Sequence, residues 1–179
     1  MQKYIALLRG INVGGRGIVR MADLKAAFVA VGCEGVATYI QSGNVIFAAR
    51  TADLPVVGRK LRPKLRALIG AEAVVLFRSH GDLEEAVRRV PIKANADDPE
   101  AKLYVSFLSR PPRRKVAFPL ISAAAALEVS RLGEAEVFVV SRKKNGRYGF
   151  PNNFVEQQFG VPATTRNWAT VTELLNLSS

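Results

Sequence analysis

The residues with the clearest chemical potential lie in a segment rich in glycine and arginine near the N-terminus, RGINVGGRG at residues 9–17. Its glycines permit backbone conformations closed to other residues, so consecutive N–H groups are able to face one concavity before a helix N-terminus. Arg9, Arg16 and Arg20 add guanidinium groups that suit phosphate or carboxylate oxygens. This combination predicts the binding of an anionic, phosphate-bearing ligand, such as a nucleotide or a nucleic acid.

Neutral hydrogen-bonding side chains gather in a second segment, TYIQSGNVIF at residues 38–47. In the predicted site, backbone N–H groups form the cradle, Arg9 and Arg16 neutralise charge, and amide side chains orient the ligand. A polar pair just before the last helix is expected to reach the same ligand. The predicted ligand-binding residues are Arg9, Asn12, Gly14, Gly15, Arg16, Tyr39, Gln41, Ser42, Asn44, Arg166 and Asn167.

Two other interpretations of these segments stay open. The glycines serve only to turn the chain, with Asn12 and Asn44 satisfying their own turns; the segment matches neither GxxxxGK[ST] nor GxGxxG. Alternatively, the cleft belongs to a small enzyme in which Tyr39 or Ser42 transfers a proton or acts as nucleophile. No paired base is visible beside them, and His80 is the only histidine.

Metal and cofactor sites are not predicted. Asp97, Asp98 and Glu100 lack the EF-hand pattern, and Pro99 favours a solvated loop there. Cys33 is the only cysteine, which precludes an internal disulfide and indicates a small packing residue.

The elements that position the N-terminal segments follow from periodicity. Strands are expected at 4–9, 36–41, 45–48 and 73–77, and helices at 21–31 and 54–68, with Pro63 kinking or splitting the latter. This is the order of a ferredoxin-like βαββαβ unit. Because its first helix returns the chain, the first two strands run parallel, with the third between them. Residues 9–17 and 41–44 are therefore expected at one edge of the sheet.

The second half predicts a similar order. We expect, in order, a strand at 103–108, a helix at 113–125, strands at 127–132 and 137–141, a turn at Asn145 and Gly146, and helices at 151–159 and 168–175. The fold class is thus predicted to be α+β, with two ferredoxin-like subdomains packed together. The first spans residues 1–90, including a connecting helix at 83–90, and the second spans residues 91–179.

Three motifs in order resemble a known family over essentially the whole chain: RGINVGG at 9–15, YIQSGNV at 39–45, and TRNWATV at 165–171. The family that they resemble is the bacterial domain of unknown function 1697 (DUF1697). The resemblance implies an α+β fold built from ferredoxin-like halves and implies no activity.

Composition bounds the remaining expectations. The 179 residues carry a formal net charge of +11, which favours phosphates, nucleic acid or another anionic partner, although coding bias toward arginine is an equal explanation. The sequence shows no secretory signal and no long apolar run, so a cytoplasmic protein without membrane contact is expected. We expect a monomer or a homodimer. A further interpretation of function is an assembly module that forms homo-oligomers.

Overall fold

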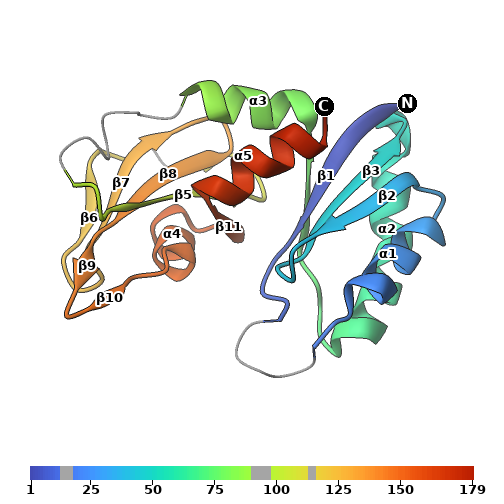
Figure 1. The fold of residues 1–179 in the computed structure, drawn as a ribbon, viewed down its shortest axis with the longest axis horizontal. Coiled ribbons are helices and arrows are strands. Elements are labelled where there is room, and N and C mark those ends of the chain that lie inside the picture. Colours follow the sequence, from blue (N-terminus) through green and yellow to red (C-terminus); the bar gives the residue numbers. More distant parts are fainter. Residues whose placement is uncertain (13–17, 90–97, 113–115) are drawn as a thin grey trace. The chain divides into compact units, whose positions relative to one another are not determined.

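The computed structural model describes residues 1–12, 18–89, 98–112 and 116–179. It is an α+β protein with two antiparallel sheets, of four and five strands, and it divides into two compact units. The first unit comprises Met1–Leu83 and Leu174–Ser179, and the second comprises Glu84–Glu173. Figure 1 shows the elements of each unit.

The first unit follows the predicted order of six elements, which is confirmed. A short 3-10 turn at Thr51–Asp53 precedes the second helix, and α3 (His80–Arg89) begins directly after the fourth strand. The six elements are β1 (Gln2–Leu8), α1 (Met21–Val29), β2 (Glu34–Tyr39), β3 (Asn44–Ala49), α2 (Leu54–Ile69) and β4 (Val75–Ser79).

The sheet of the first unit has the strand order β2-β3-β1-β4. Strand β3 is antiparallel to both β1 and β2, with Ile5 opposite Ile46 and Thr38 opposite Val45. Strands β1 and β2 are therefore parallel, as predicted. Their carboxyl ends, at Leu8 and Tyr39, lie at the same edge of the sheet.

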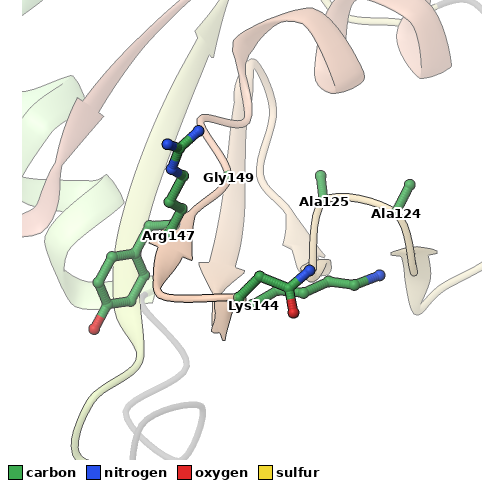
Figure 2. A pocket seen from close by; sticks show the side chains of 7 residues that line it. Ala124, Ala125, Lys144, Arg147 and Gly149 are labelled. Atoms are coloured by element: carbon green, nitrogen blue, oxygen red, sulfur yellow. The ribbon is translucent and has the colours of Figure 1, made fainter.

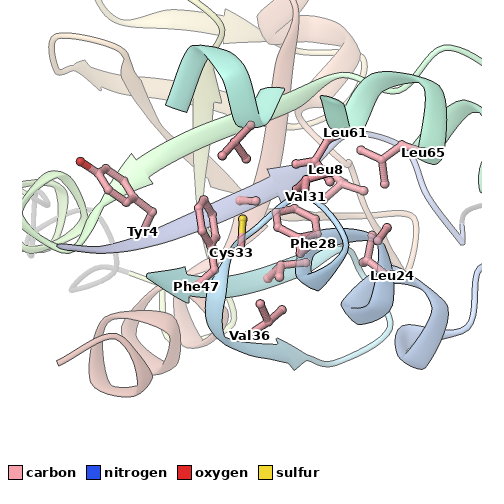
Figure 3. Close-up of a cluster of buried hydrophobic side chains, with 14 of the residues drawn as sticks. Tyr4, Leu8, Leu24, Phe28, Val31, Cys33, Val36, Phe47, Leu61 and Leu65 are labelled. Atoms are coloured by element: carbon pink, nitrogen blue, oxygen red, sulfur yellow. The ribbon is translucent and has the colours of Figure 1, made fainter. Parts of the chain in front are cut away.

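One hydrophobic cluster joins the two helices to one face of this sheet (Figure 1). Phe28 from α1 and Leu61 from α2 meet Phe47 of β3 in a layer whose side chains are almost fully buried (Figure 3). The ring centroids of Phe28 and Phe47 lie 5.4 Å apart, a separation at which aromatic rings attract each other. Burial of this cluster fixes both helices on the sheet.

Helix α2 runs without a break through Pro63, so the predicted split is wrong. Proline removes one backbone donor, but its side chain is exposed here, while Val57, Leu61 and Leu65 are buried on the sheet. Each buried leucine contributes roughly 2 kcal/mol, so the stripe outweighs a proline penalty of about 3 kcal/mol. Gly70, at φ 74°, ends the helix in the left-handed conformation.

The second unit contains a five-stranded sheet of order β11-β5-β8-β7-β6, in which every pair is antiparallel. The predicted strand at 103–108, the hairpin, the turn at Asn145 and Gly146, and the two last helices are confirmed. The elements are β5 (Lys102–Leu108), β6 (Leu120–Ser122), β7 (Leu127–Leu132), β8 (Glu136–Ser141), β9 (Lys143–Lys144), β10 (Arg147–Tyr148), α4 (Asn152–Phe159), β11 (Ala163–Asn167) and α5 (Trp168–Leu177).

The helix predicted at 113–125 is wrong in its described part. Residues 120–122 form β6, which pairs with β7 through Leu120 and Val129, and residues 123–126 turn between them. Strand pairing overrides the helix propensity of the alanine run, and Pro119 disfavours a helix interior. Strand β11 was not predicted either. The second unit therefore departs from the βαββαβ order.

Candidate functional site

Asn12 closes the loop between β1 and α1. Its Nδ2 donates to the carbonyl oxygens of Gln41 at 2.9 Å and Val19 at 3.2 Å, while its Oδ1 accepts from the Val19 N–H at 2.8 Å. Asn12 adopts a positive φ of 56°, which asparagine tolerates better than most residues. The two segments that the sequence predicted at one edge do converge, and one side chain joins them.

A close backbone approach reinforces this convergence. The Leu8 N–H donates to the Gly43 carbonyl oxygen at 2.8 Å. A Cβ added at Gly43 would lie 2.7 Å from the Ile11 side chain and 2.8 Å from Leu8 Cβ, and Gly43 also has a positive φ of 74°. Only glycine fits at this point of the β2–β3 turn.

Asn44 is fully buried, with 0% of its surface exposed, and it braces the same turn. Its Nδ2 donates to the Tyr39 carbonyl oxygen at 3.1 Å and to Ser42 Oγ at 2.9 Å. These contacts favour the structural interpretation of Asn12 and Asn44, because each holds a turn. The Gln41 side chain, in contrast, is exposed, and Tyr39 and Ser42 are half-buried.

The arginines of this region differ in their partners. Arg20 lies just before α1 and forms an ion pair with Asp23, Nε to Oδ2 at 2.8 Å. The hydrogen bond and charge of Asp23 raise the pKa of Arg20 above its ordinary value. Arg9 is exposed, and its backbone N–H donates to the Val74 carbonyl oxygen at 2.9 Å, which fixes the base of the loop beside β4.

Three of the predicted residues, Gly14, Gly15 and Arg16, lie outside the described residues. The segment that contains them starts after Asn12 and returns at Ile18, which is exposed, and Val19, which is buried. Asn12 and Val19, on either side of it, are joined by two hydrogen bonds of the Asn12 side chain.

Arg166 and Asn167 lie in the second unit, where both side chains support local structure. Arg166 is only 7% exposed, and its Nη1 donates to Thr164 Oγ1 at 2.8 Å and to the Thr165 carbonyl oxygen at 2.9 Å. Burial lowers the pKa of Arg166 to about 10. Asn167 Oδ1 accepts from the Thr170 N–H at 2.7 Å, so Asn167 caps α5.

The single cysteine and histidine occupy structural positions. Cys33 is buried in the core of the first unit (Figure 3), and burial raises the pKa of its thiol to about 11. His80 begins α3, and its Nδ1 lies 3.0 Å from Ser178 Oγ. Ser178 is buried and donates to the Leu175 carbonyl oxygen at 3.0 Å, so this pair packs the chain end against α3.

A pocket of about 450 Å³ lies in the second unit, between the turn before β7 and the β9–β10 hairpin (Figure 2). Sequence reasoning missed it, because its two walls are about twenty residues apart in the chain and no local pattern links them. Lys144 Nζ donates to the Ala123 carbonyl oxygen at 2.7 Å across it. Its lining residues are Ala124, Ala125, Lys144, Asn145, Arg147, Tyr148 and Gly149.

A second pocket, of about 390 Å³, lies in the first unit near the start of α2. It carries both signs of charge, from Arg50 and Lys60 and from Glu34 and Asp53. Arg50 Nε and Asp53 Oδ2 pair with each other at 2.7 Å. None of the predicted ligand-binding residues lines either pocket.

Two other features are absent from the described parts of the chain. No helix there has the length and apolar character needed to cross a membrane. No group of three or more His, Cys, Asp or Glu side chains there is placed to hold a metal ion.

Comparison with known proteins places the chain in a family. No curated protein matches it. Among solved structures, "conserved bacterial protein SP0830 from Streptococcus pneumoniae" is similar, with a TM-score of 0.66 and 21% identity, and the alignment covers 99% of each chain. At this identity the likeness shows the fold alone. The family described as "Protein of unknown function (DUF1697)" matches residues 1–138, and the chain therefore belongs to the DUF1697 family.

Proposed function

We propose that the first unit binds a phosphate-bearing anion at a rim formed by residues 9–17 and 41–44. The observation that carries the proposal is the triple hydrogen bonding of Asn12, which joins Asn12 to Val19 and to the β2–β3 turn at Gln41. Residues that are held in place before binding lose less conformational entropy when a ligand binds. The loop also leads directly into the N-terminus of α1, whose unpaired N–H groups favour negative charge.

Charge at this rim comes from Arg9 and Arg16. Arg20 contributes less, because Asp23 already neutralises its guanidinium group. Bidentate hydrogen bonds from arginine to phosphate are among the stronger polar interactions in proteins. Arg9 is exposed at the carboxyl end of β1, where its side chain has access to a ligand in solvent.

The neutral residues of the rim divide into two roles. Asn12 and Asn44 hold the loop and the turn, and Gly14 and Gly15 supply backbone N–H groups. Tyr39, Gln41 and Ser42 then provide the exposed or half-buried side chains that orient the ligand. A contribution from Arg166 and Asn167 stays a prediction.

The test is a calorimetric titration of the full chain with inorganic phosphate and with ATP at low salt. Wild-type protein is expected to bind, and the double variant Arg9→Gln/Arg16→Gln is expected to bind roughly 10- to 100-fold more weakly, because each charged hydrogen bond contributes about 1.5 kcal/mol or more. The Arg50→Gln variant is the control, since Arg50 is exposed and ion-paired with Asp53. Wild-type protein that binds neither probe would contradict the proposal, as would equal affinity in the double variant.

We also propose a topology for the first unit. The β2-β3-β1-β4 order supports a ferredoxin-like topology for the first unit. Subdomains of 1–90 and 91–179, and cytoplasmic residence, stay predictions from the sequence.

A further inference from the structure

The solvent face of helix α2 is strongly basic. Its sequence contains five basic residues and no acidic residue, and all five basic side chains are exposed. Arg59, Arg62 and Arg66 follow one another at i, i+3 and i+7, which places them along one side of the helix. Lys60 and Lys64 flank this stripe one turn apart. Because the apolar stripe of α2 is buried on the sheet, the basic stripe is the surface that the helix presents to solvent.

Most cations of α2 are not compensated by nearby acidic side chains. Among the described residues, four of them have no acidic side chain within ion-pair distance, and only Arg66 has a partner, Glu72, at 3.3 Å with both side chains more than 60% exposed. Ion pairs hold basic side chains elsewhere, at Arg20, Arg50, Arg88, Arg89, Arg142 and Lys143. Cations without an acidic partner also occur outside α2 in the described residues, but no other described helix carries more than one of them.

We infer that the solvent face of α2 docks onto the sugar-phosphate backbone of double-stranded DNA. From residue 59 to residue 66 the helix rises about 10 Å. B-form DNA presents about six phosphate charges over that length, at one charge per about 1.7 Å of axis. The cations of α2 therefore match the density of charge on a duplex, which requires no base reading.

The chemistry of the face selects this occupant over other polyanions. Single strands are held by stacking on aromatic side chains, and α2 contains none. Duplex RNA is recognised through its phosphates and through 2′-hydroxyl groups that both donate and accept hydrogen bonds, whereas the cations of α2 only donate. A membrane-surface helix inserts its apolar face into lipid, whereas Val57, Leu61 and Leu65 are buried in the protein core.

The inference is independent of the rim proposal, because α2 carries no rim residue. The experiment is a fluorescence anisotropy titration of the full chain against a short DNA duplex of mixed sequence, over a range of salt concentrations. Four phosphate contacts predict a slope of about −3.6 in log affinity against log salt. The test variant replaces the four unpaired cations, Arg59→Gln, Lys60→Gln, Arg62→Gln and Lys64→Gln.

This variant is expected to lose roughly 100-fold in affinity at low salt and most of the salt slope. A matched control removes the same charge at ion-paired sites, Arg50→Gln, Arg88→Gln, Arg142→Gln and Lys143→Gln, and is expected to bind nearly as wild type. Unchanged thermal unfolding shows that both variants fold, since every replaced side chain is at the surface.

Other results would overturn the inference. The first is that wild-type protein does not bind the DNA duplex at low salt. The second is that the control variant loses as much DNA affinity as the α2 variant. The third is that wild-type protein binds duplex RNA, a single strand or phosphatidylserine vesicles more tightly than it binds the DNA duplex. The Arg9→Gln/Arg16→Gln protein is expected to keep DNA binding. Loss in that protein, with retention in the α2 variant, would assign the DNA to the rim instead.

Discussion

The side-chain amide of Asn12 donates a hydrogen bond to the backbone carbonyl oxygen of Gln41, with a distance of 2.9 Å. This bond spans 29 residues of sequence and joins the loop after β1 to the turn after β2. The same side chain also pairs with both backbone groups of Val19. Asn12 is therefore a positioning residue for the rim.

Replacement of Asn12 by alanine is expected to lower the free energy of unfolding by about 2 kcal/mol, because backbone groups of Val19 and Gln41 lose their partner. Asn12→Asp separates the contacts: its carboxylate still accepts from the Val19 N–H but no longer donates to either carbonyl oxygen. The measurement is urea unfolding followed by circular dichroism. Asn176→Ala, at an exposed position, is the control and is expected to change stability little. Equal stability of Asn12→Ala and wild type would contradict the positioning role.

Gly43→Ala is expected to destabilise the first unit by about 3 kcal/mol, since the new methyl group meets Ile11 and Leu8 and the positive φ is strained. Gly70→Ala is a matched control, because Gly70 has the same φ of 74° with nothing within 4 Å of the added Cβ. It is expected to cost about 1 kcal/mol from backbone strain alone. Thermal unfolding of the two variants measures the difference in their stability. Equal losses of stability would contradict the prediction, because they would mean that the added methyl group at Gly43 is accommodated without a steric cost.

Cys33 is expected to resist alkylation in the native protein. Because burial raises the pKa of this thiol from 9.0 to about 11, its thiolate population at pH 8 is lowered roughly 100-fold relative to the unfolded chain. Mass spectrometry after iodoacetamide treatment, with and without urea, measures the two rates. Rapid native labelling would contradict the buried placement.

The same pKa shift predicts a pH dependence of stability. Between pH 9 and about pH 11 the unfolded chain releases the Cys33 proton while the folded chain retains it. The free energy of unfolding therefore falls as pH rises through this window. The Cys33→Ala variant lacks this contribution and is expected to lose stability less steeply. Parallel pH profiles for the two proteins would count against the assignment.

Asn167→Ala is expected to lower stability by about 1 kcal/mol, because the Thr170 N–H loses its cap at the start of α5. Asn167→Asp keeps a side-chain oxygen acceptor and is expected to retain most of that stability. Urea unfolding compares the two. An aspartate variant as unstable as the alanine variant would mean that the amide group, rather than the cap, is required.

Local residue patterns predict most elements of the first unit and the convergence of its two polar segments. Periodic apolar residues define β1, α1 and the hairpin locally, and the connection through α1 requires β1 and β2 to run parallel. The turn at Asn145 and Gly146 was also predicted, because it depends on residues adjacent in the chain.

Features that depend on partners distant in the chain were set by tertiary contacts. Residues 120–126 form β6 and a turn in place of a helix because β6 pairs with β7, and α2 continues through Pro63 because its leucines are buried. Asn12 and Asn44 became supports of two turns because folding brought backbone groups to their amides. The uncompensated charge of α2 has the same origin, since the positions of acidic residues around a helix are fixed by the fold and not by local sequence.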